Sequence, residues 1–531
     1  MATYTSLLLL LVAQQVRAFV VPSLEQLAIL ADIEPSTREQ EPILGQTGNT
    51  PKKIAIIGSG ITGASAASRL YEGFRFSAPA DQQPSITVFE RNPIIGGRIT
   101  QAYAYDSMIY PIDTCAATFD SEDLCIVSSA VVAGLTLQAR ITTRPRTGEG
   151  IWDGDEMLAV EEEFRDAIAW SEFRQRKWSQ RYDRSPTSFS PLVNTIRGSL
   201  GLVLGTALPI LGGGASIGVA NLSAEVEIAG LSEMAKSFQC SETNYEDLDG
   251  MFDSPEAKRF GRELVNAGTR ERYFANGDEL NVLEYILGFQ DQLPSYVSEG
   301  NLRLVERLLK LSTPDVRLGA EVQKIETKGK NDHRLTIVPT DGGVPATEQF
   351  DAVILATPYS LANITFDPPL QNATDLIQHY EDSFVTHFTT PSRLNQTFFN
   401  WTDTMPQNIL TTTSSSNTTA SPFFSLTLLK QYARGSPPTA ENLYKIVSRE
   451  EIAFTDIQQY LEAPANITWI DVQPLPRSVP VKTGKCRRLV ENLEVAPGVF
   501  YAGAGEQVIA SADIGCRLGV NAASLLLGKA R

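Results

Sequence analysis

The sequence is poor in the residues that build metal centres and disulfide scaffolds. Its 531 residues include only five cysteines and three histidines. Structural zinc sites need closely spaced Cys or His pairs, and small disulfide-stabilised folds are dense in cysteine. The cysteines here are scattered over the chain, at Cys115, Cys125, Cys240, Cys486 and Cys516. The sequence therefore argues against a disulfide scaffold, and no metal site is predicted.

Positive charge is also in deficit. The chain has 45 Lys and Arg against 62 Asp and Glu, a net charge of −17. An acidic protein repels phosphate backbones and anionic lipid surfaces, so no nucleic acid partner is expected. Apolar residues make up 42% and charged residues 20%, ordinary values for a folded protein with a sizeable core. At roughly 150 residues per domain, the length alone suggests about three or four units.

The apolar stretches of the sequence are either short or interrupted by proline and glycine. Residues 1–18 hold an apolar run, Leu7 to Ala13, before Val16-Arg17-Ala18, which predicts a secretory signal peptide although no Lys or Arg precedes the run. A buried N-terminal strand or helix is the alternative. Residues 198–221 carry no charge, but Pro209 and the Gly212–Gly214 run would break a membrane helix. We interpret this segment as a buried segment or a hairpin. The alternative is an apolar lip that covers a ligand or contacts a membrane.

Acceptor motifs for N-glycosylation support a secretory route. Seven N-x-Ser/Thr sites occur, at Asn221, Asn363, Asn372, Asn395, Asn400, Asn417 and Asn466. We expect exposed, glycosylated loops and a secreted protein or one of a vacuolar or lysosomal lumen. An oxidising compartment would permit a disulfide, with Cys115 and Cys125 the nearest pair by proximity alone. The odd cysteine count leaves one thiol over.

A dinucleotide-binding turn lies near the start of the predicted first domain. The apolar run Ile54–Ile57 predicts a buried strand, Gly58-Ser59-Gly60-Ile61-Thr62-Gly63 follows it, and residues 64–73 have a helical pattern. Gly58 permits the tight turn, Gly60 lets the backbone approach a pyrophosphate, and Gly63 lets the helix pack closely on the strand. A second strand, residues 86–89, ends at Glu90, which is placed to accept a ribose hydroxyl.

Both NAD and FAD use such a unit, and the next residues favour FAD. The stretch from Glu90 and Arg91 to Gly96-Gly97-Arg98 resembles the extended flavin fingerprint of amine-oxidase-like flavoproteins. The resemblance implies that Gly97 and Arg98 continue along the FAD pyrophosphate, where a guanidinium pairs well with phosphate. We expect noncovalent FAD, with covalent attachment through Cys115, Cys486 or Cys516 as the alternative.

Two distant segments resemble the rest of such an FAD site. Residues 316–325 resemble the strand whose valine, here Val322, holds adenine through its backbone, and residues 351–358 resemble a strand that returns to the FAD domain. Near the C-terminus, residues 499–506 form a strand and glycine turn before a helix over 511–527. The resemblance places Gly503, Gly505 and Glu506 beside the flavin ring and ribityl chain.

These motifs predict an α/β fold of two interleaved units in place of three or four domains. A discontinuous Rossmann-like FAD-binding domain of the amine-oxidase type would be interleaved with an α+β substrate domain. The FAD-binding parts are predicted at 53–140, 316–370 and 486–531, and the substrate parts at 141–315 and 371–485, behind the signal peptide and a linker over 19–52.

The whole pattern resembles one family, the prenylcysteine oxidases or lyases, from about Lys53 onward. Beyond the FAD motifs, the resemblance rests on residues 150–154 (GIWDG), a predicted helical stretch over 263–286 with the RYFANGDELN core, residues 299–301, the run 354–369 and the Cys486 segment. It implies oxidative cleavage of the thioether in farnesyl- or geranylgeranyl-cysteine by FAD and O2. The products would be cysteine, the prenyl aldehyde and H2O2.

Two segments depart from the family pattern. The family tends to have small Ala-Gly-Gly-Ser residues after an acidic residue beside the flavin, where this chain has Asp113-Thr114-Cys115-Ala116-Ala117. Residues 186–242 are also unlike the family's aromatic and basic stretch. Both departures keep two alternatives open: an oxidase acting on a prenylated or otherwise apolar secondary metabolite by dehydrogenation or oxidative cyclisation, and a non-catalytic FAD fold that binds lipid.

Few catalytic side chains are expected, because the flavin supplies the chemistry and the protein supplies orientation and an apolar pocket. No Ser-His-Asp or paired-carboxylate pattern is present. Asp113 and Glu506 are the catalytic candidates, to tune the flavin or position water, and ordinary turn or capping carboxylates are the alternative. We interpret His387, within the strand-like FVTHF, as a packed histidine rather than a base.

Overall fold

The computed structural model describes a large part of the chain. The described residues are 51–77, 79, 83–107, 111–115, 119, 123–139, 147–162, 259, 261–280, 295–371, 373–402, 404–412, 421–434, 439–481, 493–503, 506 and 510–530. The predicted signal peptide, nearly all of the predicted linker and the glycine-rich 198–221 segment lie outside them. Within the described residues, no helix has the length and apolar content needed to cross a membrane.

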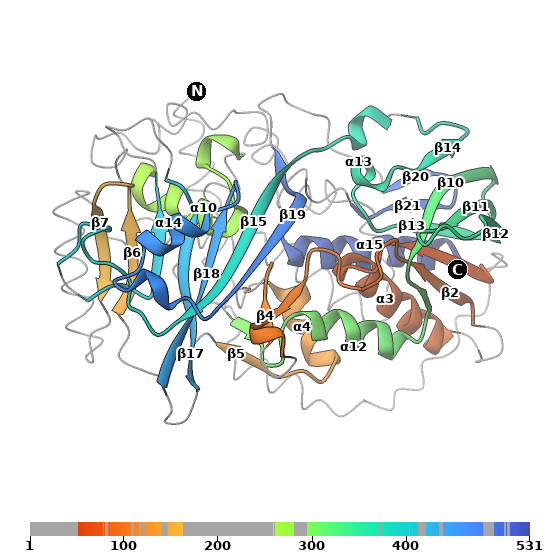
Figure 1. The fold of residues 1–531 in the computed structure, drawn as a ribbon. Coiled ribbons are helices and arrows are strands. Elements are labelled where there is room, and N and C mark those ends of the chain that lie inside the picture. The colour runs from red at the N-terminus through yellow and green to blue at the C-terminus, as the bar shows by residue number, and fades with distance from the viewer. Residues whose placement is uncertain are drawn as a thin grey trace, which may run out of the picture.

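A six-stranded sheet forms the centre of one half of the molecule (Figure 1). Its order is β20 (Glu494–Ala496), β21 (Val499–Tyr501), β13 (Ala352–Leu355), β1 (Lys53–Ile57), β2 (Ser85–Phe89) and β9 (Asp315–Arg317). All neighbours are parallel except β20 and β21. The four inner strands, β21, β13, β1 and β2, are mostly apolar and buried, as expected for a parallel sheet covered on both faces. Three distant parts of the chain therefore share one sheet.

Helices cover one face of this sheet. Helix α3 (Ile61–Ser77) follows the glycine turn and packs against α15 (Ala512–Ala530) and α12 (Leu302–Ser312), and α4 (Leu124–Val132) packs on α15. Helices α3 and α15 approach each other so closely that a Cβ on Gly519 would lie 2.1 Å from the Thr62 carbonyl oxygen. Small residues at this crossing bring the glycine turn and the C-terminal helix together.

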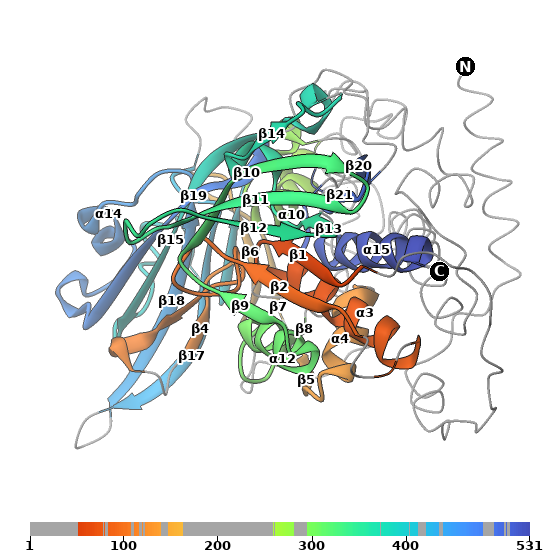
Figure 2. The same ribbon diagram turned by 90° about the vertical axis from the view of Figure 1, so that its right-hand side faces the viewer.

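A four-stranded sheet lies above strands β1, β2 and β9 of the six-stranded sheet in Figure 2. Its order is β12 (Ala346–Phe350), β11 (Asp332–Pro339), β10 (Ala320–Gly329) and β14 (Thr365–Asp367). The sequence suggested one strand over 316–325, and this detail is wrong. Gly319, with φ +62°, turns the chain, so that β9 joins one sheet and β10 joins the other.

The other half of the molecule contains a seven-stranded sheet, on the left in Figure 1. Its order is β19 (Trp469–Val481), β15 (His379–Thr390), β18 (Thr439–Ser448), β17 (Ser425–Arg434), β16 (Asn408–Thr411), β6 (Thr147–Trp152) and β7 (Met157–Glu162). All pairs are antiparallel except β16 with β6. Trp152 packs with Phe398, Phe399 and Phe423 in a second apolar core.

Shorter elements join the two halves. Hairpin β3 (Gln101–Tyr103) and β4 (Pro111–Asp113) follows the glycine loop, and β5 (Leu137–Ala139) pairs with β8 (Ser295–Val297). The helix predicted within 263–286 is interrupted: a π turn (Gly261–Val265) leads into α10 (Asn266–Tyr273), which ends where Phe274 adopts φ +56°. Two further short helices are α13 (Tyr359–Ala362) and α14 (Phe454–Gln459).

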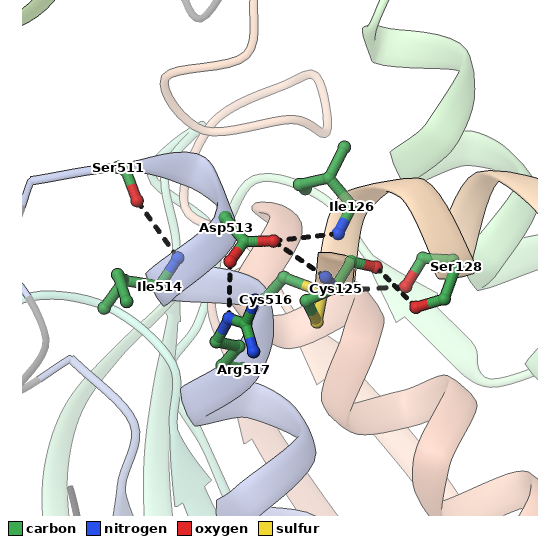
Figure 3. A network of polar contacts seen from close by, with 9 residues as sticks. Cys125, Ile126, Ser128, Ser511, Asp513, Ile514, Cys516 and Arg517 are labelled. Carbon is green, nitrogen blue, oxygen red and sulfur yellow. Dashed lines mark hydrogen bonds and ion pairs between the residues drawn. A yellow bond between two sulfur atoms is a disulfide. The ribbon is translucent and has the colours of Figure 1, made fainter. Parts of the chain in front are cut away.

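A disulfide between Cys125 and Cys516 joins α4 to α15 (Figure 3). The suggested pairing of Cys115 with Cys125 is therefore wrong. Proximity in sequence did not indicate the partner, which lies 391 positions away. Asp513 reinforces this junction, because its Oδ1 accepts the N–H groups of Cys125 (2.8 Å) and Ile126 (3.1 Å) at the start of α4, and its Oδ2 accepts from Arg517. Cys115 is buried and is not part of this disulfide.

Four of the seven predicted glycosylation sites lie in described residues. Asn363, Asn400 and Asn466 are exposed, and Asn395 is partly buried, with its side-chain nitrogen donating to the Gln459 carbonyl (3.3 Å). The other three, Asn221, Asn372 and Asn417, lie outside the described residues.

Candidate functional site

The first glycine loop connects the carboxyl end of β1 to the start of α3. Gly58 has φ +107°, and its N–H donates to the Phe89 carbonyl (2.8 Å), which ties the turn to β2. A Cβ on Gly63 would lie 1.9 Å from the Gly58 carbonyl oxygen, so a side chain there would clash with the backbone. Gly60 has room within the protein, since the nearest atom to its Cβ would be 3.7 Å away. Gly58 therefore forms the turn and Gly63 the close contact, and the approach of Gly60 to a pyrophosphate stays a prediction.

The second glycine loop lies directly against the first. Gly60 and Gly96 form an isolated bridge, and the Gly96 N–H donates to the Ser59 carbonyl (3.2 Å). Gly97 has φ +60°, and a Cβ there would approach the Gly60 Cα to 3.4 Å. The two loops together form a backbone wall of the cavity described below, at the end of α3 that carries its unpaired N–H groups.

Glu90 and Arg91 follow β2 at the same edge of the sheet. The buried Glu90 carboxylate accepts from the Ser59 N–H (3.0 Å) and hydroxyl (2.8 Å) through Oε2, and from the backbone and side-chain N–H groups of Asn92 (2.9 Å each) through Oε1. The Arg91 guanidinium donates to the Leu361 carbonyl (2.9 Å). Both side chains line the cavity.

Arg98 forms an ion pair with Glu506, where the sequence suggested a phosphate partner. The Arg98 guanidinium also donates to the Ser478 carbonyl (3.3 Å), and the Tyr380 hydroxyl donates to Glu506 (2.7 Å). Burial and the neighbouring Glu506 carboxylate raise the pKa of Tyr380 well above its usual value, so this phenol stays protonated. Arg98 and Glu506 therefore lie together at the cavity, and the phosphate contact stays a prediction.

Val322 and Gly503 also line the cavity, from β10 and from the turn after β21. The register of β10 shifts just after Val322, a β-bulge that interrupts the regular backbone pairing at that point. A Cβ on Gly503 would meet the Tyr501 ring at 2.6 Å, so this turn also needs glycine. Gly505 lies outside the described residues.

Asp113 ends β4 and faces the cavity. Its Oδ1 accepts from the Asn301 N–H (2.9 Å) and from the Gln101 amide (3.3 Å). Burial raises the pKa of Asp113, and these hydrogen bonds and Lys445 oppose the rise. Thr114, next in sequence, presents its carbonyl to the Lys445 ammonium (2.6 Å), and Cys115 also lines the cavity.

A single cavity of about 1490 Å³ connects these groups. It extends from the glycine loops to the seven-stranded sheet, where β16, β17 and β18 contribute side chains. Its volume exceeds the roughly 300–1,000 Å³ of pockets that bury a drug-sized ligand, so a dinucleotide and a substrate have room together. One end is glycine backbone with a helix N-terminus, and the other is the face of a sheet.

A row of polar side chains crosses the sheet at this end, and the sequence analysis did not identify it as a group. Strand register pairs neighbours along the row, whose members are Asp471, His387, Lys445, Thr427 and Asn408. Paired residues point to the same face of a sheet. Lys445, within the otherwise apolar run Leu443–Val447, was the one local indication of this polar row. Its neighbours in the row come from strands far apart in sequence.

His387 is completely buried in this row, as expected for a packed histidine. Its Nδ1 lies 3.9 Å from Asp471 Oδ2, and neither ring nitrogen has a hydrogen-bond partner among the described residues. Burial lowers the pKa of His387, the Asp471 carboxylate opposes this, and Lys445 adds to it. The ring is therefore neutral at physiological pH.

The residues at the glycine end fit FAD. A pyrophosphate needs backbone that it can approach closely, and Gly60 and Gly97 supply it beside the N-terminus of α3. Glu90 lies at the tip of β2, where a carboxylate binds ribose in this type of unit. Among the described residues, no group of three or more His, Cys, Asp or Glu is arranged to hold a metal ion.

Comparison with known proteins agrees with this geometry. The model of an NAD(P)-binding Rossmann-like domain matches residues 56–125, and the prenylcysteine lyase family model matches residues 231–530. No curated protein matches the sequence.

Among solved structures, the wild-type putrescine oxidase bound to putrescine is similar, with a TM-score of 0.56 and 14% identity, covering 90% of this chain and 99% of that one. The cyclohexylamine oxidase from Brevibacterium oxydans IH-35A is similar with the same TM-score, identity and coverage. These likenesses show an amine-oxidase-like fold. The match to the family model covers more than half of the sequence, and the chain therefore belongs to the prenylcysteine lyase family, as an FAD-dependent oxidoreductase.

Proposed function

We propose that this chain oxidatively cleaves the thioether of farnesyl- or geranylgeranyl-cysteine. One prenylcysteine, one O2 and one water would give cysteine, the prenyl aldehyde and H2O2. The observation that carries the proposal is the continuity of the cavity from the glycine loops to the seven-stranded sheet. Membership of the prenylcysteine lyase family supports the thioether as the bond that is cleaved.

The wall opposite the glycine loops suits a prenyl chain. Bound FAD would supply a hydride acceptor for the carbon next to sulfur and a site of reaction with O2. The chain's own residues hold the isoprenoid and exclude water from it. The apolar side chains of this wall are Ile151, Leu410, Leu428, Leu429, Leu443, Val447, Leu475 and Val479.

Cleavage also needs one water molecule beside the oxidised carbon. In this proposal Asp113 and Lys445 hold that water, since both line the cavity and lie near each other through Thr114. The proton that water loses on attack needs an acceptor, and Asp113 can supply one as its carboxylate. Hydrogen bonds from Asn301 and Gln101 orient Asp113 for this role.

The test is to incubate the purified, FAD-loaded protein with S-farnesylcysteine in air and to measure H2O2 and farnesal. We expect both products in equal amounts, and loss of flavin absorbance when the substrate is added without O2. If neither farnesylcysteine nor geranylgeranylcysteine reduces the flavin, the proposal is wrong.

A second candidate is oxidation of a prenylated or otherwise apolar metabolite without cysteine. It is favoured by Thr114 and Cys115, buried where the family tends to have smaller residues. Bleaching of the flavin by a prenylated aromatic compound and not by prenylcysteines would select it.

We also propose that the protein passes through the secretory pathway to the outside or to a vacuolar or lysosomal lumen. The buried Cys125–Cys516 disulfide and the exposed Asn363, Asn400 and Asn466 support this compartment. A mass decrease on endoglycosidase treatment and a mature N-terminus after Ala18 would agree with it. An unglycosylated protein that retains Met1 would contradict it.

A further inference from the structure

The carboxylates that line the cavity differ in how fully their oxygens are engaged. Glu90 accepts from Ser59 and Asn92, and Glu506 pairs with Arg98 and Tyr380. Asp513 is shared between the start of α4 and Arg517, at the disulfide junction of Figure 3. Burial raises the pKa of Asp113 and so disfavours its charge. These four groups are poorly suited to bind an additional cation. Two further carboxylates of the lining, Asp123 before α4 and Glu321 on β10, do not belong to the end of the cavity formed by the seven-stranded sheet.

Glu271 is different, and it lies at the substrate end of the cavity. It belongs to α10, which packs on β16, and its side chain lines the cavity. The Asn408 side-chain N–H donates to Glu271 Oε1 (3.1 Å), while the Asn408 Oδ1 accepts from the Thr427 hydroxyl (2.6 Å). This network fixes one carboxylate oxygen of Glu271. Glu271 has no ion-pair partner among the described residues.

Helix α10 holds Glu271 rigidly. Asn266 donates to the Thr412 hydroxyl (3.0 Å) from the first turn of the helix. The fully buried Arg270 donates to the Thr411 hydroxyl (3.0 Å) and to the Phe423 carbonyl (2.9 Å). A carboxylate on an immobilised helix loses little conformational entropy when it binds a ligand, which is a requirement for a selective site.

Arg272 adds the complementary charge. It follows Glu271 directly, is also only partly buried, and lines the same cavity. A carboxylate and a guanidinium that line the same cavity match the two charges of an α-amino acid, an ammonium and a carboxylate. The apolar side chains of β16, β17 and β18 lie next to them on the cavity wall.

We infer that Glu271 and Arg272 form a binding subsite for the amino acid headgroup of the substrate, with Glu271 binding the ammonium and Arg272 the carboxylate. The inference rests on the proposed function and deepens it by naming the residues that bind the headgroup of that substrate. Asn408 is a positioning residue, because its side-chain N–H donates to Glu271 while the Thr427 hydroxyl fixes the Asn408 amide.

The test compares S-farnesylcysteine with 3-(farnesylthio)propionate, the same thioether without the amino group. Glu271→Gln keeps the hydrogen bond from Asn408 and removes the negative charge. We expect kcat/KM for farnesylcysteine to fall about 10–100-fold in this variant, while kcat/KM for the propionate stays within about twofold of the wild type. The control variant is Glu299→Gln, an exposed carboxylate outside the cavity, which should change neither substrate.

A second variant tests the other charge. Arg272→Gln should lower kcat/KM for 3-(farnesylthio)propionate, which keeps its carboxylate, and leave kcat/KM for farnesylcysteamine, which lacks it, nearly unchanged. Equal losses on both substrates of a pair, in a variant that retains FAD, would overturn the subsite. If the wild type oxidises none of the three thioethers, the proposed function fails, and the inference fails with it.

Discussion

Arg98 and Glu506 form an ion pair between two segments that lie 408 positions apart in the sequence. The pair joins the second glycine loop to the turn that follows β21, and both residues line the cavity. Arg98 is 40% exposed and Glu506 19%, so solvent screens the attraction in part. It nevertheless connects two of the three chain segments that build the six-stranded sheet.

This relationship predicts coupling between the two residues. Arg98→Met and Glu506→Gln should each lower the free energy of unfolding, and the double variant should lose less than the sum, with a coupling of about 1 kcal/mol. Urea unfolding of the four proteins without added FAD measures it. Additive losses would show that the pair contributes nothing to stability.

The two glycines of the first loop should separate folding from cofactor binding. Gly60→Ala leaves the protein fold intact because its Cβ has 3.7 Å of room, but it places a methyl group against the pyrophosphate, and Gly60→Asp adds a negative charge there. We expect weaker FAD binding in the first variant and loss of FAD in the second, with thermal stability of the FAD-free protein little changed.

Gly63→Ala is the contrasting variant. Its Cβ would overlap the Gly58 carbonyl oxygen, so we expect a loss of about 1–3 kcal/mol in the free energy of unfolding even without FAD. Flavin absorbance after gel filtration and thermal melts of the apoproteins measure both properties. A Gly60→Asp protein that retains FAD normally would count against the assignment of this loop.

Removal of the disulfide should destabilise the protein strongly. The bond closes a loop of 391 residues, for which chain entropy alone gives roughly 6 kcal/mol, and measured losses are usually about 2–5 kcal/mol. We expect the Cys125→Ser/Cys516→Ser variant to unfold at lower urea concentration than the wild type. Under reducing conditions the two proteins should converge, and a difference that persists would point to packing instead of the cross-link.

The buried histidine predicts a pH dependence of stability. The folded-state pKa of His387 is lowered below the ordinary value of 6.5, so the unfolded chain binds more protons as the pH falls through 6.5. His387 therefore lowers stability on acidification from about pH 7.5 to pH 5.5. We expect a smaller fall in melting temperature over this range in His387→Gln than in the wild type. His333, whose pKa is also lowered by burial, should behave in the same way in His333→Gln.

Local patterns predicted the first βαβ unit closely. The strand expected at 54–57 spans Lys53–Ile57, and the helix expected at 64–73 spans Ile61–Ser77. The strand expected at 86–89 spans Ser85–Phe89. This region could be predicted because tight turns with positive φ and close backbone contacts both favour glycine over every other residue. The predicted domain boundaries remain predictions.

Features that depend on pairing between distant segments could not be predicted. Lys445 and His387 each interrupt an apolar run, but only the register of β15 and β18 makes them neighbours. The disulfide partner of Cys516 could not be predicted, because it follows from the packing of α4 on α15. Glu271 lies in a family-like motif, and its position at the cavity follows from the contact between α10 and β16.

The strand order of the six-stranded sheet also constrains how the protein is made. Ile54 of β1 pairs with Ala352 of β13, so β1 emerges from the ribosome long before its second neighbour exists. Strand β13 must in turn wait for β21, where Tyr501 pairs with Leu355. Contacts between such distant residues form slowly and late in folding. The turn at Gly503 and helix α15 close the cavity from the last residues of the described chain. Stable cofactor capture is therefore an event that follows synthesis of the chain, and a nascent chain stalled before β21 would have the glycine loops without the site.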